Sequence, residues 1–487
     1  MNAAVPRPPR IELAPGLEVP RILTGLWQVA DMERDGGALD APRAARALAE
    51  YVEAGFDAFD MADHYGSAET ITGQLLRSLG PGRARAFTKW CPPPGSMAPE
   101  VVRAGVQQRL ERLGLQCIDL LQFHWWQYRH PGYLDAMAEL AALRAEGVIR
   151  HLGVTNFDTD HLRLLLKHGI PVATNQVCFS LLDRRAAGRM SELCRATGVR
   201  LLAYGALAGG FLSERWLGRE EPRAVADWSK SKYRRFIEAI GGWDALQGIL
   251  AAAAEVARKH RVSIANVAVR WVLDHDAVGA VIVGARPGAS EHRADNLGAF
   301  AFSLDAQDRE TLERAISRTR ELDGDCGDEY RKPPFLTASG DLSHHLEAMA
   351  PVWPPLAAGP GRQRVDSGSR WEAFAGYARA VRVGARILVS GTTATHGAGT
   401  VVCRGDAEGQ AVYVLDKIAA GVEALGGRLE DVVRSRVFLR DLSAWEPVAR
   451  VHGRYFGAIR PANTLLGVGG LVGDYELEIE AEAEVGG

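Results

Sequence analysis

Cysteine is scarce in this sequence, and its scarcity argues against two kinds of small protein. Only 6 of the 487 residues are cysteine, they are widely scattered, and no Cys-x-x-Cys pair occurs. A disulfide framework or a zinc ribbon needs cysteines at short, regular spacings. There is also no His-Glu-x-x-His, and His344 and His345 are adjacent rather than at ligand spacing. We therefore expect reduced thiols, no metal site and a cytoplasmic location.

Long apolar runs and a strong charge of one sign are absent as well. No stretch is long and apolar enough to span a membrane, and the amino-terminal segment lacks the apolar core of a secretory signal. The formal net charge is only -3, and no basic tract suits a nucleic acid. The expected partners are a small-molecule substrate and further copies of the chain, with no nucleic acid and no membrane.

The first two thirds of the chain alternate between short apolar runs and segments with apolar residues at helical spacing. Eight such units predict a parallel (β/α)8 barrel, the TIM barrel, whose functional residues lie at the carboxyl ends of the strands. A hairpin over residues 11–19 is expected to close the bottom of the barrel. An insertion over residues 213–242 is either a solvated loop or a loop that folds over a cofactor. The expected strands span residues 22–27, 58–62, 86–90, 118–124, 151–155, 172–179, 201–207 and 278–284.

The pattern changes after a proline-rich segment. A chain of 487 residues is too long for one ordinary domain. We predict a barrel domain over residues 10–345, a linker over residues 346–361 and a smaller α+β domain over residues 362–487. Its expected strands span residues 377–383, 386–391, 432–439, 464–468 and 476–483, and its expected helices span residues 406–425 and 445–456.

Four side chains near the ends of strand-like runs can together protonate a carbonyl oxygen. They are Asp60, Tyr65, Lys89 and His124. An isolated phenol titrates near pH 10, and a nearby lysine cation should lower the pKa of Tyr65. The carboxylate can hold the lysine in place, and the imidazole can steer a carbonyl substrate. The set therefore suits proton delivery while a hydride reaches the carbonyl carbon.

The short sequence motifs around these residues resemble those of the aldo-keto reductase family. Asp60 and Tyr65 lie in an Asp-x-Ala-x-x-Tyr-Gly motif, Lys89 in Phe-Thr-Lys-Trp, and His124 in Asp-Leu-Leu-Gln-Phe-His. The resemblance covers roughly residues 10–345. It implies an oxidoreductase that reduces an aldehyde or ketone, or oxidises the corresponding alcohol or sugar. Tyr65 is then the general acid and base.

The same resemblance implies a nicotinamide cofactor at the barrel mouth, with NADPH preferred over NADH. The chain shows no intact Gly-x-Gly-x-x-Gly, so a doubly wound dinucleotide fold is not indicated. Asn156 and Gln176 would hold the carboxamide, and Tyr204 would stack on the nicotinamide ring. The adenine side would be bound by Gly284, Arg286, Asp295 and Asn296.

Other residues of the barrel are expected around these two sites. Arg286 or Arg293 could clamp a 2′-phosphate through a forked pair of hydrogen bonds. Trp27 and Trp125 are expected walls of the substrate pocket, whereas Trp126 is expected in the core. Neighbouring residues of a strand point to opposite faces, so the last two cannot both face the substrate.

The carboxyl-terminal region contains four short motifs, Tyr377–Gly384, Val389–Gly391, Arg460–Thr464 and Leu477–Ala481. On these motifs residues 362–485 resemble the reactive-intermediate deaminase family, also called YjgF-like, whose fold is chorismate-mutase-like. In these deaminases an arginine within a Pro-Ala-Arg word binds the substrate carboxylate. This chain has Asn463 there, which cannot replace the forked cation. Tyr377 and Glu478 match the aromatic and acidic positions of the family's cleft. Because family members commonly form trimers, we expect a trimer through this domain.

Three interpretations of the whole chain remain open. The first is an NADPH-dependent oxidoreductase whose second domain trimerises or binds a small metabolite. The second is a bifunctional enzyme in which the carboxyl-terminal domain processes an imine or enamine and the barrel reduces the released carbonyl. The third is a cofactor-sensing regulatory or scaffold protein. The four residues around Tyr65 favour an enzyme, Asn463 argues against ordinary deamination, and the fold alone does not name the substrate.

Overall fold

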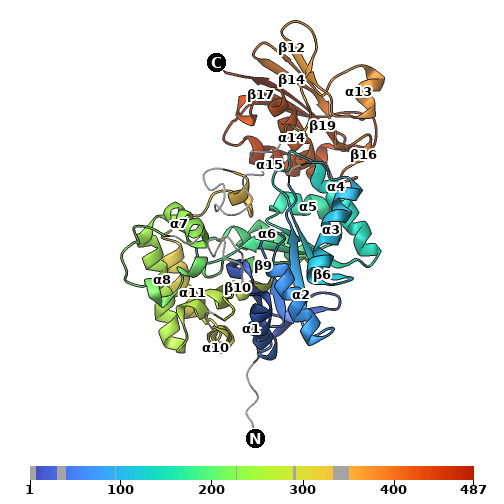
Figure 1. Ribbon diagram of the computed structural model, residues 1–487. Helices are drawn as coiled ribbons and strands as arrows, with labels where there is room; N and C mark the ends of the chain where they lie inside the picture. Colours follow the sequence, from blue (N-terminus) through green and yellow to red (C-terminus); the bar gives the residue numbers. More distant parts are fainter. Residues whose placement is uncertain are drawn as a thin grey trace. The chain divides into compact units, whose positions relative to one another are not determined.

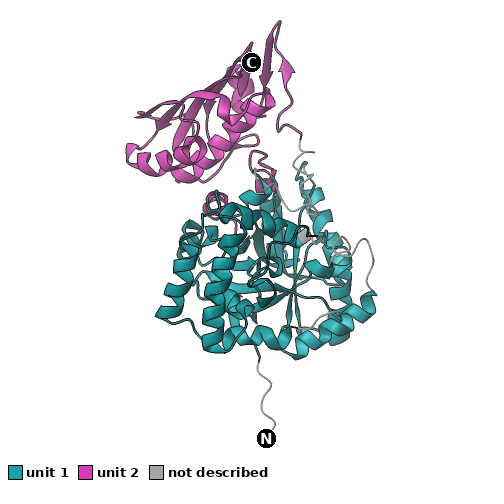
Figure 2. Cartoon of the chain, turned by 90° about the vertical axis from the view of Figure 1, so that its left-hand side faces the viewer, with its two compact units in different colours: residues 1–126, 136–159, 171–347 teal, residues 127–135, 160–170, 348–487 magenta. Residues whose placement is uncertain are grey.

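The computed structural model of the chain describes residues 7–29, 40–93, 95–225, 228–288, 292–332 and 350–486 (Figure 1). It consists of two compact units, which are coloured separately in Figure 2. Residues 1–126, 136–159 and 171–347 form the first unit, and residues 127–135, 160–170 and 348–487 form the second. The predicted linker lies partly outside the described residues. Its described part includes β11 (Leu356–Ala357), which is a strand of the second unit rather than free linker.

Eight parallel strands close into a barrel in the first unit, which confirms the predicted fold class. Around the barrel each strand pairs with the next one in the chain, and β10 closes the ring against β3. The strands are β3 (Ile22–Gly25), β4 (Ala58–Asp60), β5 (Arg85–Trp90), β6 (Ile118–His124), β7 (Ile149–Thr155), β8 (Val172–Cys178), β9 (Arg200–Tyr204) and β10 (Val278–Gly284).

Helices alternate with these strands along the chain, and several begin at a side chain that caps the first turn. The Asp40 carboxylate accepts from the Arg43 amide at the start of α1, and Ser263 does the same for Asn266 at the start of α9. The helices of this region are α1 (Ala41–Glu53), α2 (Ala68–Leu79), α3 (Pro99–Leu113), α4 (Gly132–Ala145), α5 (Thr159–Lys167), α6 (Arg189–Thr197), α8 (Trp243–His260), α9 (Ile264–Leu273), α10 (Arg293–Leu297) and α11 (Ala306–Ile316).

A hairpin closes the amino-terminal end of the barrel. It is formed by β1 (Arg10–Ala14) and β2 (Leu17–Pro20), which pair antiparallel. Leu13 and Leu17 of the hairpin pack in one buried cluster with inward residues of the strands, including Leu23, Phe87 and Leu120. The interior below the mouth is therefore filled with apolar side chains, and the polar chemistry is confined to the carboxyl ends of the strands.

The insertion after β9 is more ordered than its sequence suggests. The described part contains a short 3-10 helix, η5 (Glu214–Trp216), and the helix α7 (Trp228–Ile240). Phe236, Ile237 and Ile240 are buried in one hydrophobic cluster with α8. After α11 the chain continues to a second 3-10 turn, η7 (Asp328–Tyr330). Both η7 and α7 contribute to the site described below.

The second unit is built on a seven-stranded sheet with the order β11-β12-β13-β14-β19-β17-β18. All neighbours pair antiparallel except β17 and β18, which run parallel. Along β19 the apolar residues Leu477, Ile479 and Ala481 are buried, and the glutamates between them are partly exposed. The elements are β12 (Arg362–Val365), α13 (Arg370–Ala375), β13 (Ala380–Val383), β14 (Arg386–Thr392), α14 (Ala407–Ala424), β17 (Val432–Leu439), α15 (Trp445–Phe456), β18 (Ala462–Gly467) and β19 (Leu477–Glu484).

The sequence analysis also made predictions about the thiols and about membrane-spanning segments. All six cysteines are free thiols, and five of them are buried. Within the ranges given above, no helix is long and apolar enough to cross a membrane.

Candidate active site

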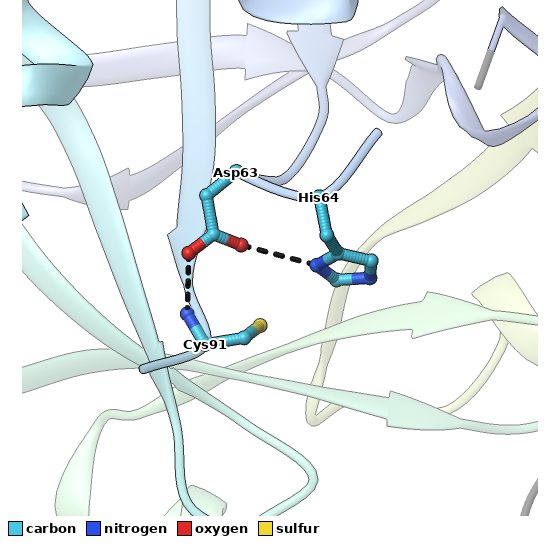
Figure 3. A group of neighbouring side chains, drawn as sticks. All are labelled: Asp63, His64 and Cys91. Carbon is cyan, nitrogen blue, oxygen red and sulfur yellow. Dashed lines mark hydrogen bonds and ion pairs between the residues drawn. The ribbon is translucent and has the colours of Figure 1, made fainter. Parts of the chain in front are cut away.

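The loop after β4 carries Tyr65 and is tied to the end of β5. The amide of Asp63 donates to the Lys89 carbonyl oxygen at 3.1 Å. One carboxylate oxygen of Asp63 accepts from the Cys91 amide at 2.9 Å, and the other lies 3.0 Å from His64 Nδ1 (Figure 3). These contacts fix the backbone just before Tyr65, so the phenol is held over the barrel mouth by its own strand and by the next one.

A buried ion pair joins the ends of β4 and β5. Lys89 Nζ donates to Asp60 Oδ2 at 2.6 Å and to the Met61 carbonyl oxygen at 3.0 Å. Both charged side chains are 3% exposed. The other Asp60 oxygen accepts from the amides of Gln122 at 3.0 Å and Gln176 at 2.7 Å. Because a buried charge without partners is costly, this saturated arrangement fixes the lysine beside the site.

Tyr65 lies against this pair in an aromatic setting. Its ring centroid is 4.9 Å from the rings of both Trp27 and His64, and Lys89 Nζ is 5.3 Å from it. Burial, and then the Asp60 carboxylate, hold the pKa of Tyr65 well above its usual value. The lowering expected from Lys89 is not seen, because Asp60 already engages that charge. The phenol therefore keeps its proton at neutral pH, as a general acid must.

His124 ends β6 and is fixed through one ring nitrogen. Nδ1 lies 3.2 Å from the Thr155 carbonyl oxygen, which can only accept, so Nδ1 carries the proton. Burial, and then the charge of Arg331, hold the pKa of His124 well below its usual value. Among the described residues Nε2 has no hydrogen-bond partner. The neutral ring therefore presents a bare acceptor.

The two tryptophans after His124 point in different directions. Trp125, expected in the pocket wall, is 0% exposed and stacks on Phe123 with ring centroids 5.8 Å apart. Trp126, expected in the core, sets its ring edge-on to His124 at 4.4 Å and donates to the Pro92 carbonyl oxygen at 3.0 Å. The structure thus places Trp126, rather than Trp125, against the imidazole, since the chain leaves the strand at this point.

Asn156, Gln176 and Tyr204 lie together at the ends of β7, β8 and β9. The backbone amide of Asn156 donates to the backbone carbonyl oxygen of Gln176 at 2.8 Å. The Tyr204 hydroxyl donates to the side-chain oxygen Oδ1 of Asn156 at 2.8 Å. Gln176 Nε2 is directed at Asp60 and at Gln122 Oε1. Together, the side chains of Asn156 and Gln176 still offer one hydrogen-bond donor, Asn156 Nδ2, and one acceptor, Gln176 Oε1. A carboxamide offers the complementary pair of groups, so these residues fit a nicotinamide.

The expected adenine side lies beyond β10. A Cβ at Gly284 would stand 2.2 Å from Gln28 Oε1, the end of a side chain that would have to shift. Arg286 is exposed. Arg293 is partly exposed and donates to Glu50 Oε2 at 2.9 Å. Residues 289–291 lie outside the described residues. Of the two arginines, Arg286 has the more open position for a 2′-phosphate.

Asp295 and Asn296 belong to the short helix α10. The Asp295 carboxylate accepts from the Ser263 hydroxyl at 3.2 Å and from the Asn266 amide at 3.4 Å, which ties α10 to the start of α9. The Asn296 backbone amide donates to the His292 carbonyl oxygen at 2.8 Å. Both residues therefore lie after Arg286 on one well-anchored turn.

Sequence reasoning missed a segment that reaches the site from beyond the barrel. In η7, Glu329 Oε1 lies 3.0 Å from the Tyr204 hydroxyl oxygen, and the Tyr330 ring lies 5.5 Å from that of His124. Glu329 is buried and ion-paired to Arg185 at 2.8 Å. The sequence offers one signal for this segment, an Asp-Glu-Tyr-Arg run at residues 328–331 that follows two closely spaced glycines.

Two groups of side chains have the composition of a metal site. In both, an arginine lies beside the carboxylates: Arg185 is 2.6 Å from Asp183 and 2.8 Å from Glu329, and Arg109 is 3.7 Å from Asp63. Burial raises the pKa of both thiols well above the usual range, which disfavours the thiolate that a metal needs. The groups are Asp63, His64 and Cys91 (Figure 3), and Cys178, Asp183 and Glu329.

In the second unit, Tyr377 and Glu478 both lie near a buried arginine, Arg379, that the sequence analysis did not single out. The Arg379 guanidinium is 5.6 Å from the Tyr377 ring and 3.2 Å from Glu372. Burial and the neighbouring Glu480 raise the pKa of Glu478, against the effect of Arg379. This cluster supplies a cation, a phenol and a carboxyl group close together.

Asn463 lies in a different set of contacts. Its side-chain amide donates to Ser435 Oγ at 2.9 Å, and Ser435 Oγ is 2.9 Å from His452 Nε2. Ser435 and Asn463 are register partners on the parallel strands β17 and β18. Within the described residues of one chain, Asn463 is therefore bound to this polar cluster and not to Tyr377 or Glu478.

Comparison with known protein families agrees with both resemblances. The model of the aldo/keto reductase family matches residues 21–317, and the chain belongs to that family. A second model, Endoribonuclease L-PSP, matches residues 367–485, the region that resembles YjgF-like proteins. The predicted combination of the two domains is confirmed.

Individual relatives resemble the barrel region. The chain is 27% identical over 328 residues to the NADH-specific methylglyoxal reductase of Escherichia coli, which covers 62% of this chain and 95% of that protein. It is 27% identical over 311 residues to the glyoxal reductase of Bacillus subtilis, covering 62% and 91%. A solved glycerol dehydrogenase from Gluconobacter oxydans has a TM-score of 0.54 at 24% identity, covering 64% and 95%, and shows the same fold.

Proposed function

We propose that the barrel is an oxidoreductase that reduces an aldehyde or ketone with NADPH, or oxidises the corresponding alcohol or sugar in reverse. The observation that carries the proposal is the buried Asp60–Lys89 ion pair next to the Tyr65 phenol and the unpartnered Nε2 of His124. A reduced nicotinamide, when bound, supplies the hydride. The proton comes from Tyr65, so the products are an alcohol and the oxidised cofactor.

Each residue of this set has a distinct task, and that of His124 is to steer the carbonyl substrate. Tyr65 donates its proton to the carbonyl oxygen and recovers it from an alcohol in the reverse direction. Lys89 offers positive charge next to the developing phenolate, and Asp60 keeps the ammonium in place at 2.6 Å. Asn156 and Gln176 orient the carboxamide, and Tyr204 stacks on the nicotinamide ring. Trp27 forms a wall beside Tyr65.

The preference for NADPH rests on Arg286. This exposed guanidinium follows the end of β10, where a 2′-phosphate could receive a forked pair of hydrogen bonds. A relative of the barrel is named as NADH-specific, so the two cofactors have to be compared directly. The proposed location is the cytoplasm, where the six free cysteines would stay reduced.

For the second unit we propose trimer formation and binding of a small metabolite. The YjgF-like fold and the Tyr377–Arg379–Glu478 cluster support this role. An imine-processing activity that feeds the barrel is the second candidate. It is favoured by the same cluster, but Asn463 does not supply the cation that such deaminases use.

A panel of aldehydes and ketones, followed by nicotinamide absorbance with NADPH and with NADH, tests the proposal. Turnover of at least one carbonyl is expected, together with the reverse oxidation of its alcohol. A protein that binds cofactor tightly but turns over no carbonyl would instead support the cofactor-sensing interpretation.

A further inference from the structure

Three consecutive residues beyond the region matched by the family model lie against the active site. The match ends at residue 317, whereas Glu329, Tyr330 and Arg331 follow it by a dozen residues. The segment belongs to the first unit. Part of the surroundings of the site therefore comes from outside the matched region.

Two buried charges fix this segment to the rest of its unit. Glu329 is 1% exposed and lies 2.8 Å from Arg185 Nη2 in an ion pair. Lys232 of α7 is 6% exposed and donates to the Tyr330 hydroxyl oxygen at 2.6 Å. Because a buried charge without a partner is costly, both contacts hold η7 firmly. The residue that follows η7, Arg331, is thereby held at the carboxyl ends of the barrel strands.

The backbone ladder between β6 and β7 ends just before two turns of the site. Its last register pair is His124 with Thr155. The next residue after each strand, Trp125 and Asn156, is buried. The backbone carbonyls of these two residues lie past the paired part of the strands. A carbonyl in a buried stretch of backbone needs a hydrogen-bond donor from elsewhere.

One guanidinium bridges these two carbonyls. Arg331 Nη1 donates to the Asn156 carbonyl oxygen at 2.6 Å, and Arg331 Nη2 donates to the Trp125 carbonyl oxygen. Nη1 also donates to the Gly327 carbonyl oxygen of its own turn at 3.1 Å. The guanidinium group is planar and rigid, so the spacing of its two terminal nitrogens sets the spacing of the two carbonyls.

The backbone at Asn156 shows how closely the segment approaches it. Asn156 has a φ of 57°, in the left-handed region that a residue with a side chain adopts only where its surroundings hold it. A Cβ at Gly327 would stand 2.0 Å from the Asn156 carbonyl oxygen, so the chain passes here at a distance that only glycine permits. The turn at Asn156 is therefore held by contacts from the tail as well as by its own strand.

The two bridged turns serve different reactants of the proposed reaction. His124, directly before Trp125, steers the carbonyl substrate, and Asn156 orients the carboxamide of the cofactor. Hydride transfer requires the two reacting carbons to be close and aligned, and a small misplacement lowers its rate by a large factor. A link between the two turns controls this alignment without contacting either reactant.

We propose that Arg331 is a positioning residue, whose guanidinium holds the turn after His124 and the turn at Asn156 at the separation that hydride transfer requires. This inference rests on the proposed function. Arg331 takes no part in binding the adenine side of the cofactor, which is assigned to residues beyond β10. Loss of the bridge should therefore slow the hydride step and leave the affinity for the cofactor nearly unchanged.

Single-turnover kinetics with a carbonyl that the wild type reduces test the proposal. Nicotinamide absorbance follows the hydride step, and fluorescence titration gives the dissociation constant of NADPH. Arg331→Met should slow hydride transfer at least about tenfold and change the NADPH dissociation constant less than about threefold. Thermal unfolding shows whether the variant is folded at the temperature of the assay.

Arg331→Lys separates the forked geometry from the positive charge. Lysine keeps the charge but offers a single nitrogen on a flexible stem, which cannot hold two carbonyls at a fixed spacing. We therefore expect Arg331→Lys to be nearly as slow as Arg331→Met. A lysine variant with the wild-type rate of hydride transfer would overturn the proposal, and this variant decides the question should Arg331→Met not fold.

Hydrogen–deuterium exchange of the protein without cofactor gives a readout that does not depend on activity. Arg331→Met should raise the amide exchange of residues 125–126 and 156–158, because the two turns lose their bridge. Arg320 offers a matched control in the same part of the chain, since it donates to the Ala239 carbonyl oxygen at 3.0 Å and to the Glu238 carbonyl oxygen at 3.4 Å. Arg320→Met should leave the hydride step and the exchange of both segments unchanged.

The failure of this proposal differs from the failure of the proposed function. A folded Arg331→Met protein with an unchanged hydride step, or with wild-type exchange in both segments, would overturn the positioning role while the reductase remains. A loss of rate that only follows a loss of NADPH affinity would overturn it as well. A wild type that reduces no carbonyl would instead remove the proposed function, and the positioning role with it.

Discussion

Two opposite charges lie next to the Tyr65 phenol, and their balance sets how the residue works. Lys89 would favour the phenolate, but its ammonium is held at 2.6 Å by Asp60, and burial adds to the effect of that carboxylate. The ground state is therefore a protonated acid. The lysine becomes useful only as negative charge develops on the phenol oxygen during proton transfer.

Loss of the Tyr65 hydroxyl should stop the reaction without preventing cofactor binding. We expect Tyr65→Phe to abolish measurable turnover, while titration of the protein with NADPH gives an affinity close to the wild type. Lys89→Met should also cripple catalysis, because it leaves the Asp60 carboxylate buried and unpaired beside Tyr65. A Tyr65→Phe protein that keeps most of its activity would remove this phenol from the mechanism.

The raised pKa of Tyr65 also predicts different pH profiles in the two directions. Reduction needs the protonated phenol, so its kcat/KM should stay flat on the alkaline side to at least about pH 9, below the ordinary phenol value. Oxidation needs the phenolate, so its kcat/KM should keep rising with pH over the same range. Initial rates of reduction and of oxidation, measured across one series of buffers, test this prediction. An alkaline fall of the reduction rate from neutrality would mean an acidic phenol instead.

Cofactor choice can be assigned to one arginine. If Arg286 meets the 2′-phosphate, Arg286→Ala should weaken NADPH binding by roughly 1.5–3 kcal/mol, about ten- to a hundredfold, and NADH binding much less. Arg293→Ala is the control, since Arg293 is occupied by Glu50 at 2.9 Å. Fluorescence titration with both cofactors measures the difference. Equal losses of NADPH and NADH affinity in Arg286→Ala would point to a structural role.

At the level of secondary structure, the sequence predicted the strands better than the loops. The runs that carry Asp60, Lys89 and His124 at or next to their ends are apolar, short and bounded by polar residues, so both the strands and these side chains could be found. Parallel strands bring such ends together at one edge. The barrel and the residues around Tyr65 therefore follow from local patterns.

The residues that were missed depend on contacts between distant parts of the chain. Arg331 is 175 positions from Asn156, and Lys232 is 98 positions from Tyr330. No local periodicity marks a 3-10 turn that packs on a barrel mouth. In the second unit α13 was missed for a related reason: it is a helix of 6 residues, too short to show a period.

The turn before η7 gives a prediction at this scale. Gly327 has a φ of +81°, and a Cβ there would stand 2.0 Å from the Asn156 carbonyl oxygen. Gly327→Ala should displace η7 and lower kcat/KM at least about tenfold, beyond the roughly 1–2 kcal/mol of stability that any side chain costs at such a φ. Gly218→Ala is the control, with a φ of +68° and nothing within 4 Å of the new Cβ. Thermal unfolding and steady-state kinetics on both variants separate the effect of backbone strain from the displacement of η7. Similar kcat/KM values for the two variants would contradict the prediction.

For the whole molecule, two truncations test where the reductase ends. Both remove the part of the second unit that follows residue 350 and keep its residues 127–135 and 160–170: one chain stops after Ala350 and the other after Ser317. The longer chain keeps Glu329–Arg331 and should still oxidise NADPH with a good carbonyl substrate, whereas the shorter chain should be inactive even if folded. A longer chain that is folded but inactive would show that the second unit contributes to catalysis.

The same proteins test the proposed assembly. Light scattering should show an oligomer, most simply a trimer, for the full chain and a smaller particle for the chain ending after Ala350. A monomeric full chain would contradict trimer formation through the YjgF-like domain. Asn463→Arg is a further check on that domain: imine hydrolysis that appears with the new cation would show that the rest of the cleft is intact.

The position of Glu329–Arg331 after the last barrel strand has a consequence for how the enzyme is made. During synthesis all eight strands have left the ribosome before this segment does, so a nascent barrel can close while its catalytic mouth is unfinished. A fusion or split of the gene placed where family similarity stops, at residue 317, would produce the same unfinished barrel permanently. A functional border for engineering this enzyme therefore lies after Arg331, beyond the point where the family similarity stops.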